Sequence, residues 1–304
     1  MHKLRQLICA MLVLALTAVL CACGKKIPQD DADPMWADIQ QNGVLRVGVY
    51  TGYGALCRRT SASAAQSSQS GESTDSSASA ESDGGEYEGY DIDLMRQIAQ
   101  RLGLKLQFVD VSASGASAQE LMNAKTIDCA IGGIEYTAGL ERIFLLTEPY
   151  LTDCGVFVLS ESSGAKNLAD LNGLRLAQVR YSTLEAELAQ SPLLSSAFSE
   201  RISVETEASA LEAVATDRAD VAFVMQTDAA NAIAEGGAFR ILQSDTGEVE
   251  TLGVCSYVIE LPLGSSTLKK RMDEAYATMQ RDKIVTQLQQ KWFGTDYVPA
   301  VSSK

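Results

Sequence analysis

Apolar residues along this chain recur in two patterns that alternate with each other. Leu45–Val49 is a short apolar run that follows Gly43, which is typical of a strand. Ile92, Met95 and Ile98 recur at helical spacing and predict a helix. The same patterns predict strands over 104–109, 129–131, 154–159, 174–179, 202–204, 220–224, 239–242 and 252–259, and helices starting within 137–145 and over 118–125, 183–190, 208–216, 227–235, 265–281 and 283–291. Alternating strands and helices of these lengths predict an α/β fold, with parallel sheets covered by helices on both faces.

The alternation of strands and helices occurs twice. A long strand is expected near 151–156, between the first and the second alternation. Another is expected near 252–258, after the second alternation ends. We therefore expect two lobes, with the chain crossing between them twice.

The first 22 residues have the features of a secretory signal. Lys3 and Arg5 precede an apolar run that is too short for a membrane-spanning helix. The run ends in a leucine, a small residue and Cys23, which resembles the bacterial lipobox and predicts a lipidated cysteine at the mature N-terminus. The alternative is an ordinary cleaved signal that ends near a cysteine. Residues 24–35 are expected to be a tether.

A serine-rich segment within 58–88 differs from the rest of the chain. Between Thr60 and Ser82 no apolar residue is larger than alanine. Such a segment cannot bury enough surface to offset the entropy lost on ordering, so we expect a disordered insertion in lobe 1. A lid or a docking role is the alternative to a tolerated surface insertion.

Charge and histidine content exclude several functions. The formal net charge is −14, which disfavours nucleic acid and anionic membranes as partners. The single histidine is His2, inside the predicted signal, so Ser-His-Asp catalysis and histidine-ligated metal sites are not expected. We expect no enzyme, no metal and no cofactor.

Six stretches, in order along the chain, resemble the extracellular solute-binding proteins of polar amino-acid importers. They are Leu45–Val49, Gly89–Leu94, Thr126–Gly133, Thr147–Tyr150, Arg218–Phe223 and Lys291–Gly294. The resemblance implies the two-lobe periplasmic-binding-protein type II fold, with lobes joined by two crossing strands. It implies lobe 1 over 36–151 plus 258–297, lobe 2 over 156–252, and a ligand in the cleft between them.

The resemblance also implies a function, a location and partners. The protein is expected to capture an amino-acid-like or other small polar solute for the membrane permease of an ABC importer. It is expected to act as a monomer at the cell surface or in the periplasm, held to the membrane only by its lipid. The alternatives are a ligand-sensing receptor without an importer and, far behind, a dehydratase-like enzyme on the same fold.

Several residues fall where this family contacts its ligand. Ser182 and Thr183 open a predicted helix whose N-terminus suits a carboxylate, although a plain N-cap has the same sequence. Gly132 and Gly133 end a buried strand where the backbone approaches the ligand. Tyr53 falls where the family places an aromatic cover, with core packing as its alternative.

Other positions depart from the family pattern. The arginine that clamps a ligand carboxylate is replaced by Leu140, and Arg142 is displaced by two positions, which turns it away from the cleft. The acid that pairs with the α-ammonium is replaced by Met225, with Asp228 near. Glu135 stands where a small hydroxyl is usual.

One hypothesis follows from these departures. Glu135, with Tyr50 and Tyr53 nearby, accepts a cationic or multi-donor group, while Arg180 takes an anionic or polar end together with Ser182 and Thr183. The alternative for Glu135 is a solvated residue at a helix entry.

The cysteines allow one disulfide. Cys57, Cys129, Cys154 and Cys255 are widely spaced, so buried free thiols are the default. Cys154 and Cys255 lie in the two strands expected to join the lobes, and in this fold such strands are usually neighbours. A bond between them would stiffen the hinge.

Overall fold

The computed structural model describes residues 33–60, 86–295 and 297–300. The predicted signal 1–22, Cys23 and most of the predicted tether lie outside the described residues. Helix α2 (Pro34–Asn42) begins inside the range 24–35, so residues 34 and 35 are helical and are not part of a tether as predicted. Pro34 at the first helical position explains this start, because its fixed φ suits a helix and it has no N–H to satisfy.

The first sheet has the strand order β4-β1-β5-β13-β6. Its central strands run parallel: β1 (Val44–Val49) pairs with β4 (Lys105–Asp110) and with β5 (Cys129–Ile131). β13 (Glu260–Leu261) runs antiparallel to both β5 and β6 (Leu145–Leu146). The half of the molecule that contains this sheet is called lobe 1 below.

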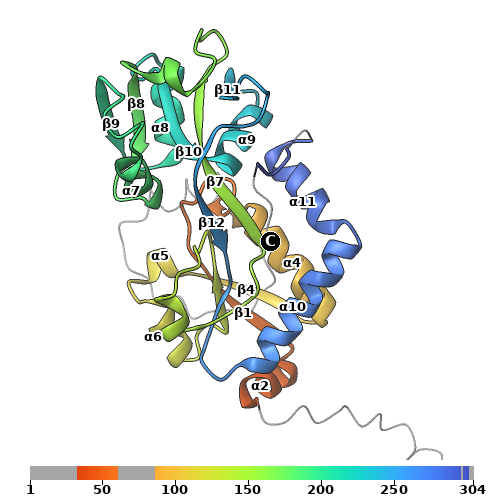
Figure 1. Ribbon diagram of the computed structural model, residues 1–304. Coiled ribbons are helices and arrows are strands. Elements are labelled where there is room, and N and C mark those ends of the chain that lie inside the picture. The colour runs from red at the N-terminus through yellow and green to blue at the C-terminus, as the bar shows by residue number, and fades with distance from the viewer. Residues whose placement is uncertain (1–32, 61–85, 296, 301–304) are drawn as a thin grey trace, which may run out of the picture. The chain divides into compact units, whose positions relative to one another are not determined.

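Helices cover the first sheet because their apolar stripes face it. α4 (Tyr90–Leu102) and α10 (Ser266–Arg281) lie beside it with α11 (Ile284–Phe293) (Figure 1). They bury side chains from all three helices in one apolar core with β1. The shorter α5 (Val111–Ser114), α6 (Ala118–Asn123) and η1 (Leu140–Arg142) pack a second core of lobe 1.

The second sheet has the order β11-β7-β10-β8-β9, with β12 also paired to β7. Its strands are β7 (Leu151–Ser160), β8 (Arg175–Val179), β9 (Glu200–Val204), β10 (Val221–Met225), β11 (Phe239–Ile241) and β12 (Thr251–Tyr257). Helices α7 (Thr183–Gln190), α8 (Glu207–Ala215) and α9 (Gln226–Ala234) and the turn η2 (Leu168–Leu171) complete this half, called lobe 2 (Figure 1). Its apolar side chains form two cores of their own.

The prediction of parallel sheets is correct for β8, β9 and β10 and wrong for β7. β7 runs antiparallel to β10, β11 and β12. The reason is that β7 enters lobe 2 from lobe 1 and β12 leads back, so the two must run in opposite directions when they lie side by side.

β7 and β12 are the two crossing strands, which confirms the two-lobe arrangement. Leu151 and Tyr257, paired at one end of the ribbon, belong to the lobe 1 core. Val156, paired with Thr251 at the other end, belongs to a lobe 2 core. The two strands therefore form a continuous hinge ribbon between separately packed halves (Figure 1).

The disulfide that the sequence left possible is absent, and the default of free thiols applies to Cys154 and Cys255. Cys154 pairs with Val254, whereas Cys255 pairs with Asp153. Successive side chains of a strand point to opposite faces, so this register places the two cysteines on opposite faces of the ribbon. Both are free thiols, as are Cys57 and Cys129.

Both ends of the serine-rich segment are ordered, unlike the prediction for 58–88. β2 (Arg58–Arg59) pairs antiparallel with β3 (Tyr87–Glu88). Arg59 holds the ladder to lobe 1 through Asp110, at 2.8 Å. The residues in between, 61–85, lie outside the described part, and the expectation of disorder there stays a prediction.

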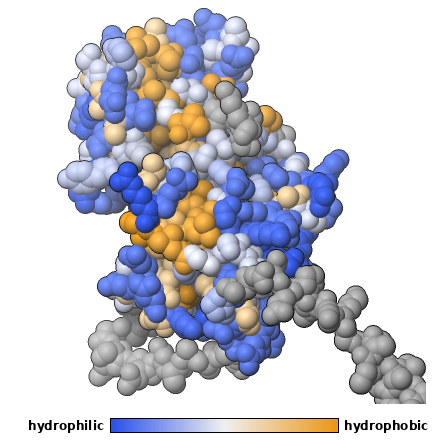
Figure 2. Space-filling view, turned by 60° about the horizontal axis from the view of Figure 1, so that its bottom comes forward, coloured by the Kyte–Doolittle hydropathy of each residue, from blue (hydrophilic) through white to orange (hydrophobic). Residues whose placement is uncertain are grey.

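The surface of the described residues is mixed in character. Figure 2 shows hydrophilic residues over much of one face and apolar residues gathered in patches near its middle. Apolar atoms normally make up about half of a folded protein's surface, so the patches alone indicate no partner. Among the residues described, no helix combines the length and apolar character needed to cross a membrane.

Candidate functional site

The loop after β1 places an aromatic ring directly over a glycine. Tyr53 is half exposed, and its backbone N–H donates to the carbonyl of Cys57 at 3.1 Å. A Cβ at Gly133 would lie 2.7 Å from the Tyr53 ring, and Gly133 has φ +63°. A Cβ at Gly132, with φ +130°, would lie 2.5 Å from the carbonyl oxygen of Tyr50. Only glycine permits this approach, so the predicted Tyr50, Tyr53, Gly132 and Gly133 are neighbours.

A buried carboxyl group that was not predicted for the site holds this glycine turn. Asp91 accepts a hydrogen bond from the Gly133 N–H at 2.9 Å. Burial raises the pKa of Asp91 to about 7, although the bond from Gly133 lowers it. Asp91 is thus a supporting residue beneath the turn; from sequence it is an ordinary acidic residue in the first turn of α4.

Glu135 and Thr183 connect the two lobes directly. The Thr183 hydroxyl lies 2.9 and 3.0 Å from the two carboxylate oxygens of Glu135. Glu135 is held next to the hinge by a bridge to Tyr257. Its negative charge contributes, after burial, to raising the pKa of Tyr53. The structure therefore brings together three residues that the sequence predicted for one site.

Ser182 acts as the N-cap of α7. Its hydroxyl accepts from the Glu185 N–H at 3.0 Å and donates to the carbonyl of Val179 at 2.8 Å. The cap is the simpler of its two predicted roles. The carboxylate of Glu185 in turn accepts from the Tyr181 N–H at 2.6 Å and from Gln178 at 2.9 Å. The start of α7 is thus occupied by carboxylates of the chain itself.

The charge of Arg180 is already paired within the protein. Its guanidinium pairs with Glu205 at 2.5 Å and lies 5.8 Å from the ring centre of Tyr181. The predicted helix that starts within 137–145 is only the short turn η1, and Arg142 in it is exposed.

Asp228 makes another contact between the lobes. Its carboxylate accepts a hydrogen bond at 3.1 Å from the N–H of Ala55, which lies in the lobe 1 loop that carries Tyr53. Burial raises its pKa to about 6, while this hydrogen bond and the charge of Arg58 lower it. A Cβ at Gly54 would lie 1.8 Å from its carboxylate, so that loop can approach α9 only with glycine there.

Met225 is a core residue rather than part of the site. It is 7% exposed and packs in the apolar core of lobe 2. What it offers to the site is its backbone N–H, whose hydrogen bond lowers the pKa of Glu207.

Two acids near Asp228 were missed from the sequence. Asp153, on the hinge strand β7, is fully buried and accepts from Thr227 at 2.6 Å and from the Cys154 N–H at 2.8 Å. Burial raises its pKa to about 7. Glu207 begins α8 and has one buried oxygen without a hydrogen-bond partner among the described residues.

The charges of neighbouring acids act on the pKa of Glu207. It is raised first by burial and then by the charges of Asp228, Asp153 and Glu135. From sequence each acid has an ordinary place, in a strand or in a first helical turn. Only the fold brings them together, so no local signal identifies them.

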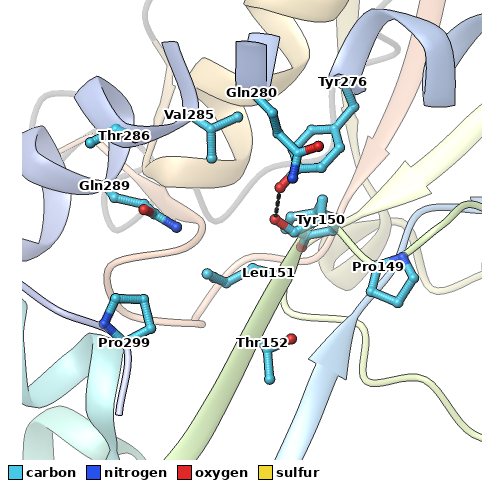
Figure 3. A pocket seen from close by; sticks show the side chains of 10 residues that line it. All are labelled: Pro149, Tyr150, Leu151, Thr152, Tyr276, Gln280, Val285, Thr286, Gln289 and Pro299. Atoms are coloured by element: carbon cyan, nitrogen blue, oxygen red, sulfur yellow. Dashed lines mark hydrogen bonds between the residues drawn. The ribbon is translucent and has the colours of Figure 1, made fainter. Parts of the chain in front are cut away.

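Two cavities lie elsewhere. One of about 390 Å³ lies beside the hinge, with Thr152, Gln280 and Gln289 around it (Figure 3). A groove of about 1210 Å³ lies between α9 and the end of α11. Tyr53, Glu135 and Thr183 line neither of them. Within the described ranges, no group of three or more His, Cys, Asp or Glu residues is placed to hold a metal ion.

Solved structures with this fold include an ancestral cationic amino acid solute-binding protein. Its TM-score is 0.67 at 21% identity, over 84% of this chain and 98% of that one. Substrate-binding domain 2 of Lactococcus lactis GlnP, in an open conformation, has a TM-score of 0.65 at 14% identity, over 84% and 97%. These likenesses show the type II periplasmic-binding fold.

Two curated relatives are named as binding proteins. The L-cystine-binding protein TcyA of Bacillus subtilis (strain 168) is 23% identical over 301 residues, which cover 96% of this chain and 99% of TcyA. The amino-acid-binding protein AabA of Dichelobacter nodosus is 25% identical over 212 residues, which cover 69% and 80%. Residues 72–295 match the profile of bacterial extracellular solute-binding proteins, family 3. Because that match spans most of the chain, the protein belongs to this family.

Proposed function

We propose that this protein captures a small cationic solute between its lobes and delivers it to the permease of an ABC importer. The observation that carries the choice of solute is the group of four carboxyl side chains where the lobes meet. The four are Glu135 of lobe 1, Asp153 of the hinge, and Glu207 and Asp228 of lobe 2. Burial raises the pKa of the last three, and the charges of the other three acids raise that of Glu207 further.

Electrostatics favours a cation at this place. A buried carboxylate is costly unless an opposite charge lies near, and a raised pKa reports that cost. Arg58 is close enough to lower the pKa of Asp228, but it is already paired with Glu88 at 3.0 Å and Glu235 at 3.2 Å. A solute ammonium or guanidinium would offset the remaining charge.

The start of α7 argues against a solute held chiefly by its carboxylate. Unpaired N–H groups at a helix start suit an anion. Here the carboxylate of Glu185 already accepts from the Tyr181 N–H just before α7, and that of Glu135 accepts from the Thr183 hydroxyl at its first residue. A solute carboxylate placed there would meet two negative charges. We therefore expect amines, guanidines and cationic amino acids to bind better than acidic or neutral ones.

Isothermal titration calorimetry tests the proposal. The panel is putrescine, L-arginine, L-lysine, L-cystine, L-glutamine and L-glutamate. We expect heat from one or more of the three cations and none from L-glutamate. Tight binding of L-glutamate or L-glutamine would refute the assignment of a cationic solute, and no binding by any member would refute the proposed solute range.

We propose further that Cys23 carries a lipid that anchors the protein to the outside of the membrane. Two acyl chains are needed for stable anchoring, as a lipobox cysteine provides. Metabolic labelling with a fatty-acid analogue should mark the wild type and leave Cys23→Ala unmarked. Equal labelling of both would contradict the anchor.

A further inference from the structure

Residues near the C-terminus make a further connection between the lobes, in addition to the hinge strands and the side-chain contacts described above. Residues 297–300 follow α11, which belongs to lobe 1. The ring of Tyr297 packs on Phe293, with ring centres 4.9 Å apart. The segment then reaches α9 of lobe 2 and pairs there with a single side chain.

That side chain is Gln226, the first residue of α9. Its Nε2 donates to the carbonyl of Val298 at 2.9 Å, and its Oε1 accepts from the N–H of Ala300 at 2.9 Å. Gln226 is 4% exposed, so these bonds are largely shielded from water. A buried amide that uses both its donor and its acceptor on one backbone segment fixes that segment in place.

Gln226 directly precedes two residues that belong to, or contact, the group of four carboxyl side chains described above. Thr227, the following residue, donates to Asp153 on the hinge strand at 2.6 Å. Asp228, one further along, accepts from Ala55 of lobe 1. Whatever holds Gln226 therefore also holds the turn of α9 that meets lobe 1.

The segment lies beside α9 and α11, which belong to different lobes and contact each other. Asn231 of α9 donates to the carbonyl of Trp292 at 2.7 Å, and Gly294 lies against Ala234. α9 and α11 must slide past each other if the lobes separate. Pro299 forms one wall of the cavity of about 390 Å³ beside the hinge, which leaves room for the segment to move.

We propose that residues 297–300 form a C-terminal strap, which ties lobe 1 to the start of α9 through Gln226 and restrains the separation of the lobes. Gln226 is a positioning residue, because it acts through Thr227 and Asp228 rather than on the solute. The strap does not depend on which solute binds. Its test uses the protein without solute, so its outcome is independent of the proposed function.

The experiment measures the distance between the lobes by double electron–electron resonance. Spin labels are carried by unnatural amino acids at Gln119 on α6 and Gln190 on α7, both exposed, so that the native thiols are untouched. Gln226→Leu removes both bonds to the segment, together with the 3.9 Å contact from the Cys154 thiol, and nearly keeps the side-chain volume. We expect it to shift the ratio of separated to close lobes by about tenfold, as the loss of two neutral hydrogen bonds implies.

Three further variants make the test decisive. Ala300→Pro removes only the N–H that Gln226 accepts and lies outside the cores, so it reports on the strap even where Gln226→Leu fails to fold. Gln226→Glu sets a buried carboxyl oxygen against the Val298 carbonyl, which is also an acceptor, and should give a shift at least as large as that of Gln226→Leu. Gln287→Leu, on the exposed side of α11, is the matched control and should match the wild type. The strap would be overturned if Gln226→Leu and Ala300→Pro both showed wild-type distances. If Gln226→Leu does not fold, wild-type distances in Ala300→Pro alone would overturn it.

Discussion

Glu135 differs from the other acids of the site because its side chain is only partly buried and is bonded across the lobes by Thr183. It is therefore free to exchange this neutral partner for a solute cation. Replacement by Gln keeps the shape and removes the charge. We predict that Glu135→Gln weakens binding of a cationic solute about tenfold or more in calorimetry, as expected for loss of a charged hydrogen bond. Glu161→Gln, exposed on lobe 2, is the control, and equal affinities of the two variants would contradict a role for Glu135.

The buried acids predict how stability depends on pH. The pKa values of Asp91 and Asp153 are raised to about 7 and that of Asp228 to about 6, above the usual value near 4. Between about pH 4 and pH 7 the folded protein therefore binds more protons than the unfolded chain, and stability falls as pH rises.

Urea unfolding of the solute-free protein between pH 4.5 and pH 8 checks this sign. We predict a decreasing free energy of unfolding across the window, with a shallower decrease in Asp153→Asn. A free energy that rises with pH would show that these carboxyl groups are not held as described. By the same linkage, the affinity for a cation should increase from pH 5.5 to pH 8.

What the sequence could predict differs between these residues. Tyr53, Gly133, Glu135 and Thr183 lie together as expected, because each follows a strand end or opens a helix. Asp153 was not expected, since a strand residue between apolar neighbours has no visible partner until Thr227 is placed opposite it. Ser182 left two roles open, and only its bonds to Glu185 and Val179 identify it as a cap.

The hinge strand β7 depends on one glycine. A Cβ at Gly155 would lie 2.5 Å from the carbonyl oxygen of Leu252 and 2.5 Å from the ring of Phe223. Gly155→Ala should therefore lower the free energy of unfolding by about 1–3 kcal/mol, as overpacking does. Gly164→Ala, whose Cβ would meet nothing within 4 Å, is the control. Equal unfolding curves for the two variants would contradict the packing of the hinge.

The same ribbon predicts the state of the thiols. The register of β7 and β12 separates Cys154 from Cys255, and burial raises the pKa of each to about 12. Alkylation after unfolding, without reductant, should modify all four of these buried or half-buried cysteines. A mass that increases by two further alkyl groups only after reduction would show a disulfide and a different register.

Elements were easier to predict than their pairing. The range 183–190 for α7 is confirmed, because a cap and an apolar stripe mark it locally. The direction of β7 was wrong, since it depends on β12, almost a hundred residues later in the chain. The strap at 297–300 could not be foreseen, because its partner Gln226 is 72 residues from Val298.

Each lobe has apolar cores of its own. Ala230 of α9 packs against the lobe 1 core, and the lobes also meet through polar contacts that include Glu135–Thr183, Ala55–Asp228 and Arg58–Glu235. Such contacts can be exchanged for contacts with a solute at little cost, whereas a shared apolar core could not be opened. Solute capture should therefore change the distance between the lobes while leaving each core intact.

Distance measurements between labels at Gln119 and Gln190, with and without added solute, examine this behaviour. With putrescine or L-arginine, whichever releases heat in calorimetry, we predict a narrower distribution at shorter distance; with L-glutamate we predict no change. Heat of binding without any change in the distribution, or shortening by L-glutamate, would contradict capture of a cation between moving lobes.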